Sequence, residues 1–163
     1  MKIIGIDPGL SGGIAVLENN QVLSIFDMPV MSEGKKNKRQ LNSAQLVTLI
    51  KENIKSSEDV AVIVEQVNAM PGQGVSSMFN FGQTFGAIKG VCAALRLPIF
   101  FVRPSKWKKH FELINSSKDS SRTKAIEMYP ALSNQLAKKK DVNKSDAILI
   151  ARFYSDTRLL DYN

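Results

Sequence analysis

The chain has 163 residues, of which 44% are hydrophobic and 23% charged, a composition typical of one ordinary globular domain with a single core. The formal net charge is +7, and residues 101–144 carry the whole surplus, with 11 Lys or Arg against 4 Asp or Glu. Basic residues concentrated in one part of a chain indicate a surface that binds polyanions, with nucleic acid as the first choice. A single cysteine excludes an intramolecular disulfide and a zinc knuckle built on a cysteine pair.

The sequence shows neither a targeting nor a membrane-spanning pattern. The first apolar stretch meets Asp7 too early for a signal peptide, and no apolar run approaches the ~18 residues of a membrane span. We therefore expect a cytoplasmic protein of a bacterium or a phage-infected cell, with no membrane partner. An organelle is the alternative if a transit peptide precedes this chain.

Short β-type runs separated by turn residues open the chain and predict an antiparallel meander of three strands, over residues 2–7, 13–17 and 21–27. Residues 30–40 have no apolar period, so we expect an exposed basic loop there. Apolar residues at helical spacing over 41–55 then predict an amphipathic helix, capped by Asn42 or Ser43.

The rest of the chain alternates strands and helices. A β-branched run over residues 60–64 predicts a strand covered on both faces, which ends directly on Glu65. After it we expect a loop over 71–77, a helix over 82–95, a strand over 98–102, a helix from 118 or 119 to 129 and a last helix over 145–154. This order predicts a single α/β domain, residues 1–163, with a mixed five-stranded sheet, antiparallel at first and then parallel, flanked by helices.

Three acidic residues stand at the ends of these elements. Asp7 follows the first strand, and Glu65 follows the covered strand, so their carboxylates lie side by side if the two strands are neighbours. Asp146 begins the last helix among small and apolar residues, on the side that faces the core. Taken singly, Asp7 is explained as a turn-forming residue, Glu65 as a solvated strand end and Asp146 as an acid in the first turn of a helix. Together they predict a metal site, because carboxylates this close need a cation or a proton between them.

Three segments, residues 4–9, 64–66 and 145–151, resemble in order and separation the signature segments of RuvC-type Holliday-junction resolvases. Residues 81–87 and 102–108 are also similar to that family, and the Trp-Lys pair at 107–108 with residues 138–141 is closer to its chloroplast branch. The resemblance implies a ribonuclease H-like fold, a homodimer, and a metal-dependent endonuclease that resolves four-way DNA junctions. It also implies symmetric nicks that leave a 5′-phosphate and a 3′-hydroxyl, and branch-migration machinery as a further partner.

The resemblance implies a site of four carboxylates holding two Mg²⁺ ions, with Mn²⁺ as a substitute. Asp7, Glu65 and Asp146 supply three. The family usually has a further ligand three residues before its last Asp, but Asn143 occupies that place and is a poor substitute for a carboxylate. Asp141 is therefore the expected fourth catalytic and metal-binding residue, and Asn143 is left to cap the helix.

Basic and aromatic side chains are expected to bind the junction. Three basic clusters would neutralise phosphates of the DNA. A single basic cluster is best explained as a solvated helix face, but three clusters that carry the whole net charge favour DNA binding. The resemblance also places residues that wedge into the junction centre after Glu65, with core packing as the alternative. The predicted DNA-binding residues are Arg103, Lys106, Lys108, Lys118, Arg122, Lys124, Lys138, Lys139 and Lys140, with Met78 and Phe79 as wedges.

Two other functions are weighed against the nuclease. Residues 7–12 also resemble the phosphate loop of the actin and sugar-kinase fold, but such kinases need two domains and about twice this length. A catalytically silent nucleic-acid-binding protein of the same fold is the second alternative, and Asn143 is the best argument for it.

Overall fold

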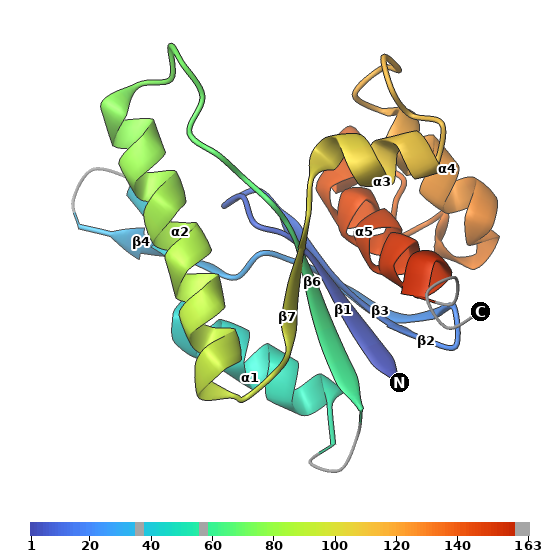
Figure 1. The fold of residues 1–163 in the computed structure, drawn as a ribbon, viewed down its shortest axis with the longest axis horizontal. Coiled ribbons are helices and arrows are strands. Elements are labelled where there is room, and N and C mark those ends of the chain that lie inside the picture. Colours follow the sequence, from blue (N-terminus) through green and yellow to red (C-terminus); the bar gives the residue numbers. More distant parts are fainter. Residues whose placement is uncertain (35–37, 56–58, 159–163) are drawn as a thin grey trace.

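The computed structural model describes residues 1–34, 38–55 and 59–158. Its centre is a five-stranded sheet in the order β3-β2-β1-β6-β7, antiparallel from β3 to β1 and parallel from β1 to β7 (Figure 1). The strands are β1 (Lys2–Asp7), β2 (Gly13–Glu18), β3 (Gln21–Asp27), β6 (Val60–Glu65) and β7 (Ile99–Val102). The predicted α/β class and mixed five-stranded sheet are therefore confirmed.

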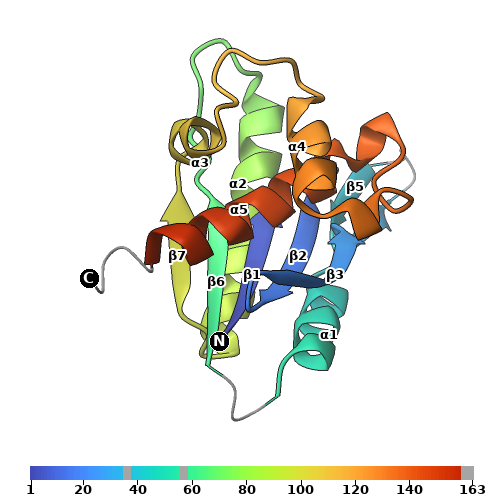
Figure 2. The same cartoon turned by 90° about the vertical axis from the view of Figure 1, so that its right-hand side faces the viewer.

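Helices cover both faces of this sheet. α1 (Ser43–Asn53) and α2 (Val75–Ala94) lie on one face, and α3 (Pro104–His110), α4 (Ser120–Met128) and α5 (Val142–Arg158) lie on the other (Figures 1 and 2). Successive side chains of a strand point to opposite faces, so Ile3 packs in the α5 layer while Ile4 packs in the α1–α2 layer. The central strands are apolar on both faces for this reason.

The segment expected to be an exposed basic loop forms a hairpin instead. β4 (Val30–Glu33) pairs with β5 (Lys38–Leu41) as a separate two-stranded sheet, and residues 35–37 lie outside the described part. Only Leu41 of these strands is buried, so their sequence carries no apolar alternation that would have revealed them.

Several helix boundaries differ from the expected ones. α2 begins at Val75 and so takes in part of the predicted loop, and the seven-residue α3 was not predicted. α5 begins at Val142, directly after a 3₁₀ turn over Lys139–Asp141, so Asn143 lies inside the helix and is not its cap. A second 3₁₀ turn, Pro130–Leu132, follows α4. At α1, the cap is Asn42, whose side chain accepts a hydrogen bond from the backbone of Gln45.

Two glycines let α5 lie directly on the sheet. A Cβ atom at Gly5 would come within 2.2 Å of the Ala147 carbonyl oxygen, and one at Gly13 within 2.8 Å of backbone atoms of Asn143 and Lys144. The first turns of α5 therefore cross β1 and β2 at backbone contact distance, as the crossing in Figure 2 shows. No helix in the described ranges is both long and apolar enough to cross a membrane.

Candidate metal centre and nucleic-acid groove

Three of the predicted acids come from elements that meet at one end of the sheet. β1 and β6 are parallel neighbours paired through Ile6 and Val64, so Asp7 and Glu65, the next residue of each strand, stand at the same edge. α5 packs against both strands and brings Asp146 to them, because the small residues on its inner face allow close approach.

The three acids act on one another through their charges. Burial, and after it the negative charges of Glu65 and Asp146, raise the pKa of Asp7 to about 7 from 3.8, against a smaller lowering effect of the Gly9 N–H and Lys108. The three carboxylates thus interact at a largely buried site. Such repulsion is what a cation placed among them would relieve.

Asp146 has an unsatisfied oxygen. Within the described part of the chain, its Oδ1 is the buried side-chain oxygen or nitrogen atom that has no hydrogen-bond partner. Burial is the main cause that raises the pKa of Asp146 to about 6, with Glu65 adding to it and Ser121, Lys108 and Lys118 opposing it. Asp146 lines a cavity of about 160 Å³ together with Lys108 and Lys118.

The environment of Glu65 differs from that of Asp146, because one carboxylate oxygen of Glu65 accepts a hydrogen bond. The Nε1–H group of Trp107 donates to Glu65 Oε2 over 2.7 Å. Burial raises the pKa of Glu65, and this hydrogen bond, together with the charge of Lys108, counteracts part of the rise. The ammonium of Lys108 itself lies 5.4 Å from the centre of the Trp107 ring.

The donor set fits a divalent metal ion in its chemistry. Carboxylate oxygens are the ligands that Mg²⁺ and Mn²⁺ take, and an unsatisfied buried oxygen beside mutually repelling acids is a site that lacks positive charge. In residues 1–34, 38–55 and 59–158, however, no three His, Cys, Asp or Glu side chains are grouped closely enough to share one ion. The three carboxylates therefore fit a divalent ion in the type and the charge of their donor atoms.

Asp141, the expected fourth ligand, is not brought to these three. Its Oδ2 accepts a hydrogen bond from the backbone N–H of Lys138 over 2.8 Å, and its Oδ1 lies 3.0 Å from Lys144 Nζ. Burial alone would raise the pKa of Asp141, but these contacts outweigh burial and hold the pKa below its usual range. Asn143, the alternative, donates a side-chain hydrogen bond to the Ser11 carbonyl. Both residues thus fasten the start of α5.

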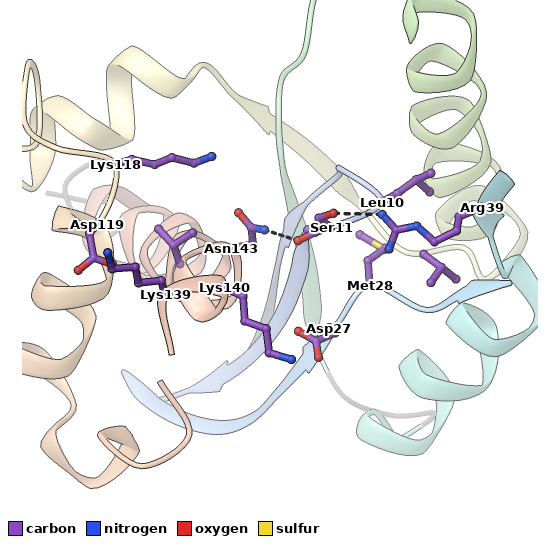
Figure 3. A pocket seen from close by; sticks show the side chains of 13 residues that line it. Leu10, Ser11, Asp27, Met28, Arg39, Lys118, Asp119, Lys139, Lys140 and Asn143 are labelled. Atoms are coloured by element: carbon purple, nitrogen blue, oxygen red, sulfur yellow. Dashed lines mark hydrogen bonds between the residues drawn. The ribbon is translucent and has the colours of Figure 1, made fainter. Parts of the chain in front are cut away.

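A groove of about 710 Å³ opens next to the turn that follows Asp7 (Figure 3). Arg39 of β5 reaches it from one side, and Lys118, Lys139 and Lys140 reach it from the other (Figure 3). Its remaining lining is partly apolar and includes the loop that follows Asp7: Leu10, Ser11, Gly12, Asp27, Met28, Val30, Asp119, Val142 and Asn143.

The other predicted basic residues have mixed surroundings. Arg103 and Lys106 are exposed on and next to α3, and Lys138 is exposed before the 3₁₀ turn. Arg122 uses its guanidinium inside the protein, with two hydrogen bonds of 2.8 Å to Asp119 and one to the Leu136 carbonyl. Lys124 lies 3.6 Å from Glu127.

The two predicted wedge residues lie on the first turns of α2. Phe79 is 66% exposed, whereas Met78 is half-buried and lines a small cavity with Phe81 and Phe85. Phe79 is thus an exposed aromatic side chain at the end of a helix, and Met78 is partly a packing residue.

Sequence reasoning missed two residues that contact the acids or the groove. Trp107 reaches Glu65 from 42 residues away, and Arg39 belongs to a hairpin without apolar alternation. No local sequence pattern indicates the contact between Trp107 and Glu65. For Arg39, the available signal was its place in the basic stretch before residue 41.

An α/β sheet with acidic residues at the ends of its neighbouring strands, crossed by a helix that supplies a third acid, defines the class as a ribonuclease H-like nuclease fold. A family model described as crossover junction endodeoxyribonuclease RuvC matches residues 3–153, and the chain belongs to this family of metal-dependent nucleases. The family named from the sequence is thereby confirmed.

Solved structures agree with this assignment. A structure of RuvC from T. thermophilus in complex with Holliday junction substrate is 14% identical and has a TM-score of 0.65, covering 99% of this chain and 96% of that one. A further Thermus thermophilus RuvC structure is 19% identical with a TM-score of 0.56, covering 97% of each chain. At these identities the likeness shows the fold. No curated protein matches the sequence.

Proposed function

We propose that this protein resolves four-way DNA junctions by metal-dependent hydrolysis of phosphodiester bonds. The observation that supports this most is the set of three mutually repelling, largely buried carboxylates, Asp7, Glu65 and Asp146, in a chain that belongs to the RuvC family. A cationic groove beside them supplies a place for a polyanion.

In this proposal the three carboxylates hold Mg²⁺, two ions for each site, with Mn²⁺ as a substitute. Bound metal ions lower the pKa of an attacking water and stabilise charge on the departing oxygen. The chain itself would bind and orient the substrate. The carboxylates stand at one end of the sheet, and we assign Lys108 and Lys118, which interact with Asp146, to the phosphate group. In this proposal a water oxygen attacks the phosphorus and the P–O3′ bond breaks, so that the products carry a 5′-phosphate and a 3′-hydroxyl, as the family resemblance implies.

Cutting two strands symmetrically requires two sites, so we propose a homodimer paired through α2. Gly82, Gly86 and Gly90 of α2 are exposed, and a Cβ atom at each would meet nothing within 4 Å. This face offers backbone contact to a second copy. Branch-migration machinery is the expected further partner, and the compartment is the one that holds the DNA substrate, the cytoplasm of a bacterium or of a phage-infected cell. The similarity of residues 107–108 and 138–141 to the chloroplast branch stays a prediction.

The test is a panel of synthetic DNA substrates. Purified protein is incubated with a four-way junction, a flap and a linear duplex of the same arm sequence, with Mg²⁺ or with EDTA. We expect paired nicks in opposite strands of the junction with Mg²⁺, and no nicks in the duplex. Equal cutting of all three substrates would contradict junction resolution.

A catalytically silent junction-binding protein is the second candidate, and one observation favours it. Asn143 stands where the family's further ligand is expected, and its side-chain amide is bonded to Ser11. Tight junction binding with no cleavage in either Mg²⁺ or Mn²⁺ would identify this function.

A further inference from the structure

The groove shares chain segments with the site of the acids. Its floor includes Ser11 and Gly12, which belong to the turn that directly follows Asp7, and Lys118 lines both the groove and the small cavity at Asp146. A chain molecule in the groove would therefore lie over the turn that follows Asp7 and next to Lys118.

The charges in the groove favour an anion. Arg39, Lys118, Lys139 and Lys140 are exposed, and within the described residues none of them forms a salt bridge with a carboxylate, although Lys118 acts on Asp146 through its charge. The two acids of the groove already have cationic partners: Asp119 Oδ1 lies 2.8 Å from Arg122 Nε, and Asp27 Oδ1 lies 3.7 Å from Lys144 Nζ. The net field is positive along both walls.

The rest of the lining suits the less polar part of a nucleotide. Apolar side chains also line the groove, the half-buried Leu10 and Val30 and, beneath them, the buried Met28 and Val142. A DNA strand presents this combination of charged phosphates at fixed spacing with sugar and base faces between them.

We propose that the β4–β5 hairpin is one wall of a groove that holds a DNA strand beside the acids, with Arg39 as its phosphate contact, and that Lys139 and Lys140 form the opposite wall. This inference rests on the proposed function. Arg39 lies 3.5 Å from Ser11 Oγ, at the outer limit of a hydrogen bond, so its guanidinium is directed over the loop after Asp7 (Figure 3).

The test compares two charge losses on one strand. Lys38 precedes Arg39 on β5, is also exposed and does not line the groove, because successive strand residues point to opposite faces. Junction affinity is measured for the wild type, Arg39→Gln and Lys38→Gln across a salt series, with Ca²⁺ in place of Mg²⁺. Arg39→Lys keeps the charge and serves as rescue.

We expect Arg39→Gln to reduce the slope of log K against log salt by about 1 for each subunit, Lys38→Gln to leave it unchanged and Arg39→Lys to restore it. Equal slopes for Arg39→Gln and Lys38→Gln would overturn the assignment while leaving junction binding intact. A wild type that binds no junction would instead reject the proposed function together with the groove.

A second inference comes from an independent contact, the hydrogen bond between Trp107 and Glu65. Trp107 is fully buried in the α3–α5 layer, and its one polar atom, Nε1–H, donates to Glu65 Oε2 over 2.7 Å. A buried donor fixes the orientation of the carboxylate that it contacts, because breaking the bond would leave a buried N–H unpaired.

We infer that Trp107 is a positioning residue that sets the orientation of Glu65 for metal binding. With Oε2 held by the indole, Oε1 of Glu65 would be the atom that binds the ion. Partners that orient a metal ligand in this way typically contribute about 10- to 100-fold in metal affinity. The inference rests on the proposed role of Glu65.

The test uses Trp107→Phe, which keeps most of the packing and removes the donor. Ca²⁺ affinity is measured by calorimetry, and thermal unfolding is measured alongside. Phe111→Leu, in the same buried cluster, is the control that perturbs packing and leaves the indole in place. Because Trp107 is the single tryptophan of the chain, its fluorescence also reports on metal binding in the wild type and in Glu65→Gln.

We expect Trp107→Phe to weaken Ca²⁺ binding at least about tenfold, and Phe111→Leu to bind Ca²⁺ normally even where its melting temperature falls as far. Ca²⁺ should change the tryptophan fluorescence of the wild type and leave that of Glu65→Gln unaltered. Equal Ca²⁺ affinity in Trp107→Phe and the wild type would overturn the inference. Absence of any Ca²⁺ binding by the wild type would reject the metal site itself.

Discussion

At the scale of single residues, Asp7 contributes strongly to the pH dependence of the stability of the metal-free protein. Burial and the charges of Glu65 and Asp146 raise the pKa of Asp7 to about 7, whereas an unfolded chain gives the ordinary value near 3.8. The folded state therefore binds the proton more tightly, and this residue makes unfolding easier as pH rises from about 4 through 7. Below that window the carboxyl is neutral in both states and the effect vanishes.

We predict that Asp7→Asn is more stable than the wild type at pH 8 in EDTA, by on the order of a few kcal/mol, and that the difference shrinks toward pH 4. Thermal unfolding of both proteins at several pH values measures it. Ca²⁺ should stabilise the wild type at pH 8 and leave the variant unchanged. A wild type that is the more stable protein at pH 8 without metal would contradict the assigned repulsion.

Asp141 is expected to contribute to stability, because both of its oxygens are used within the protein. Asp141→Asn keeps an acceptor for the Lys138 N–H and loses the charge that faces Lys144, so we predict a loss of ~1–3 kcal/mol in the free energy of unfolding at pH 7. Denaturant unfolding measures this loss. Cleavage at saturating protein should remain near normal below the melting range. Complete loss of cleavage at unchanged stability would make Asp141 the fourth ligand.

At the scale of elements, the strands were predictable because their apolar pattern is local. β1, β3 and the start of β6 agree with the expected ranges, and the acids at the strand ends followed from the same pattern. The β4–β5 hairpin was not predictable, since its strands are nearly all exposed and contain Lys, Arg and Gln. The start of α5 was expected three residues late, because Asp141 fixes the preceding turn through contacts that no periodicity shows.

The contact between Trp107 and Glu65 could not be predicted either, because no local sequence pattern indicates it. It joins two residues 42 positions apart on different elements, so only the packed structure reveals it. Residue types and strand ends therefore indicate which acids take part, and packing decides which neighbours orient them.

The α2 face gives a prediction about assembly. Because a Cβ atom at Gly86 meets nothing within the chain, Gly86→Leu should leave the fold of one subunit intact, or stabilise it by up to ~1 kcal/mol through helix propensity. The same side chain would separate two helices that approach at the backbone. We predict dimers for the wild type and monomers for Gly86→Leu by light scattering at micromolar concentration, with Gly86→Ala intermediate. A dimeric Gly86→Leu protein would place the interface elsewhere.

At the scale of the whole molecule, the basic surplus should control affinity more than chemistry. Lys138, Lys139 and Lys140 are exposed beside the groove, and they supply no ligand to the acids. Replacing all three with Gln should weaken junction binding and reduce the salt slope by about 1 for each lost phosphate contact. Cleavage at saturating protein should fall far less. A binding series in Ca²⁺ across salt concentrations measures the slope, and an unchanged slope would mean that these lysines are a solvated face.

The central claim is that Asp7, Glu65 and Asp146 form a metal-dependent site that cuts four-way junctions. Its most direct test is single-turnover cleavage of a synthetic junction by the wild type and by Asp7→Asn, Glu65→Gln and Asp146→Asn, with junction affinity measured in parallel in Ca²⁺. Amides are poor replacements for carboxylates on a hard cation, so the account predicts metal-dependent paired nicks for the wild type, and for each variant intact binding without detectable cleavage. Cleavage by Glu65→Gln at the wild-type rate would contradict it.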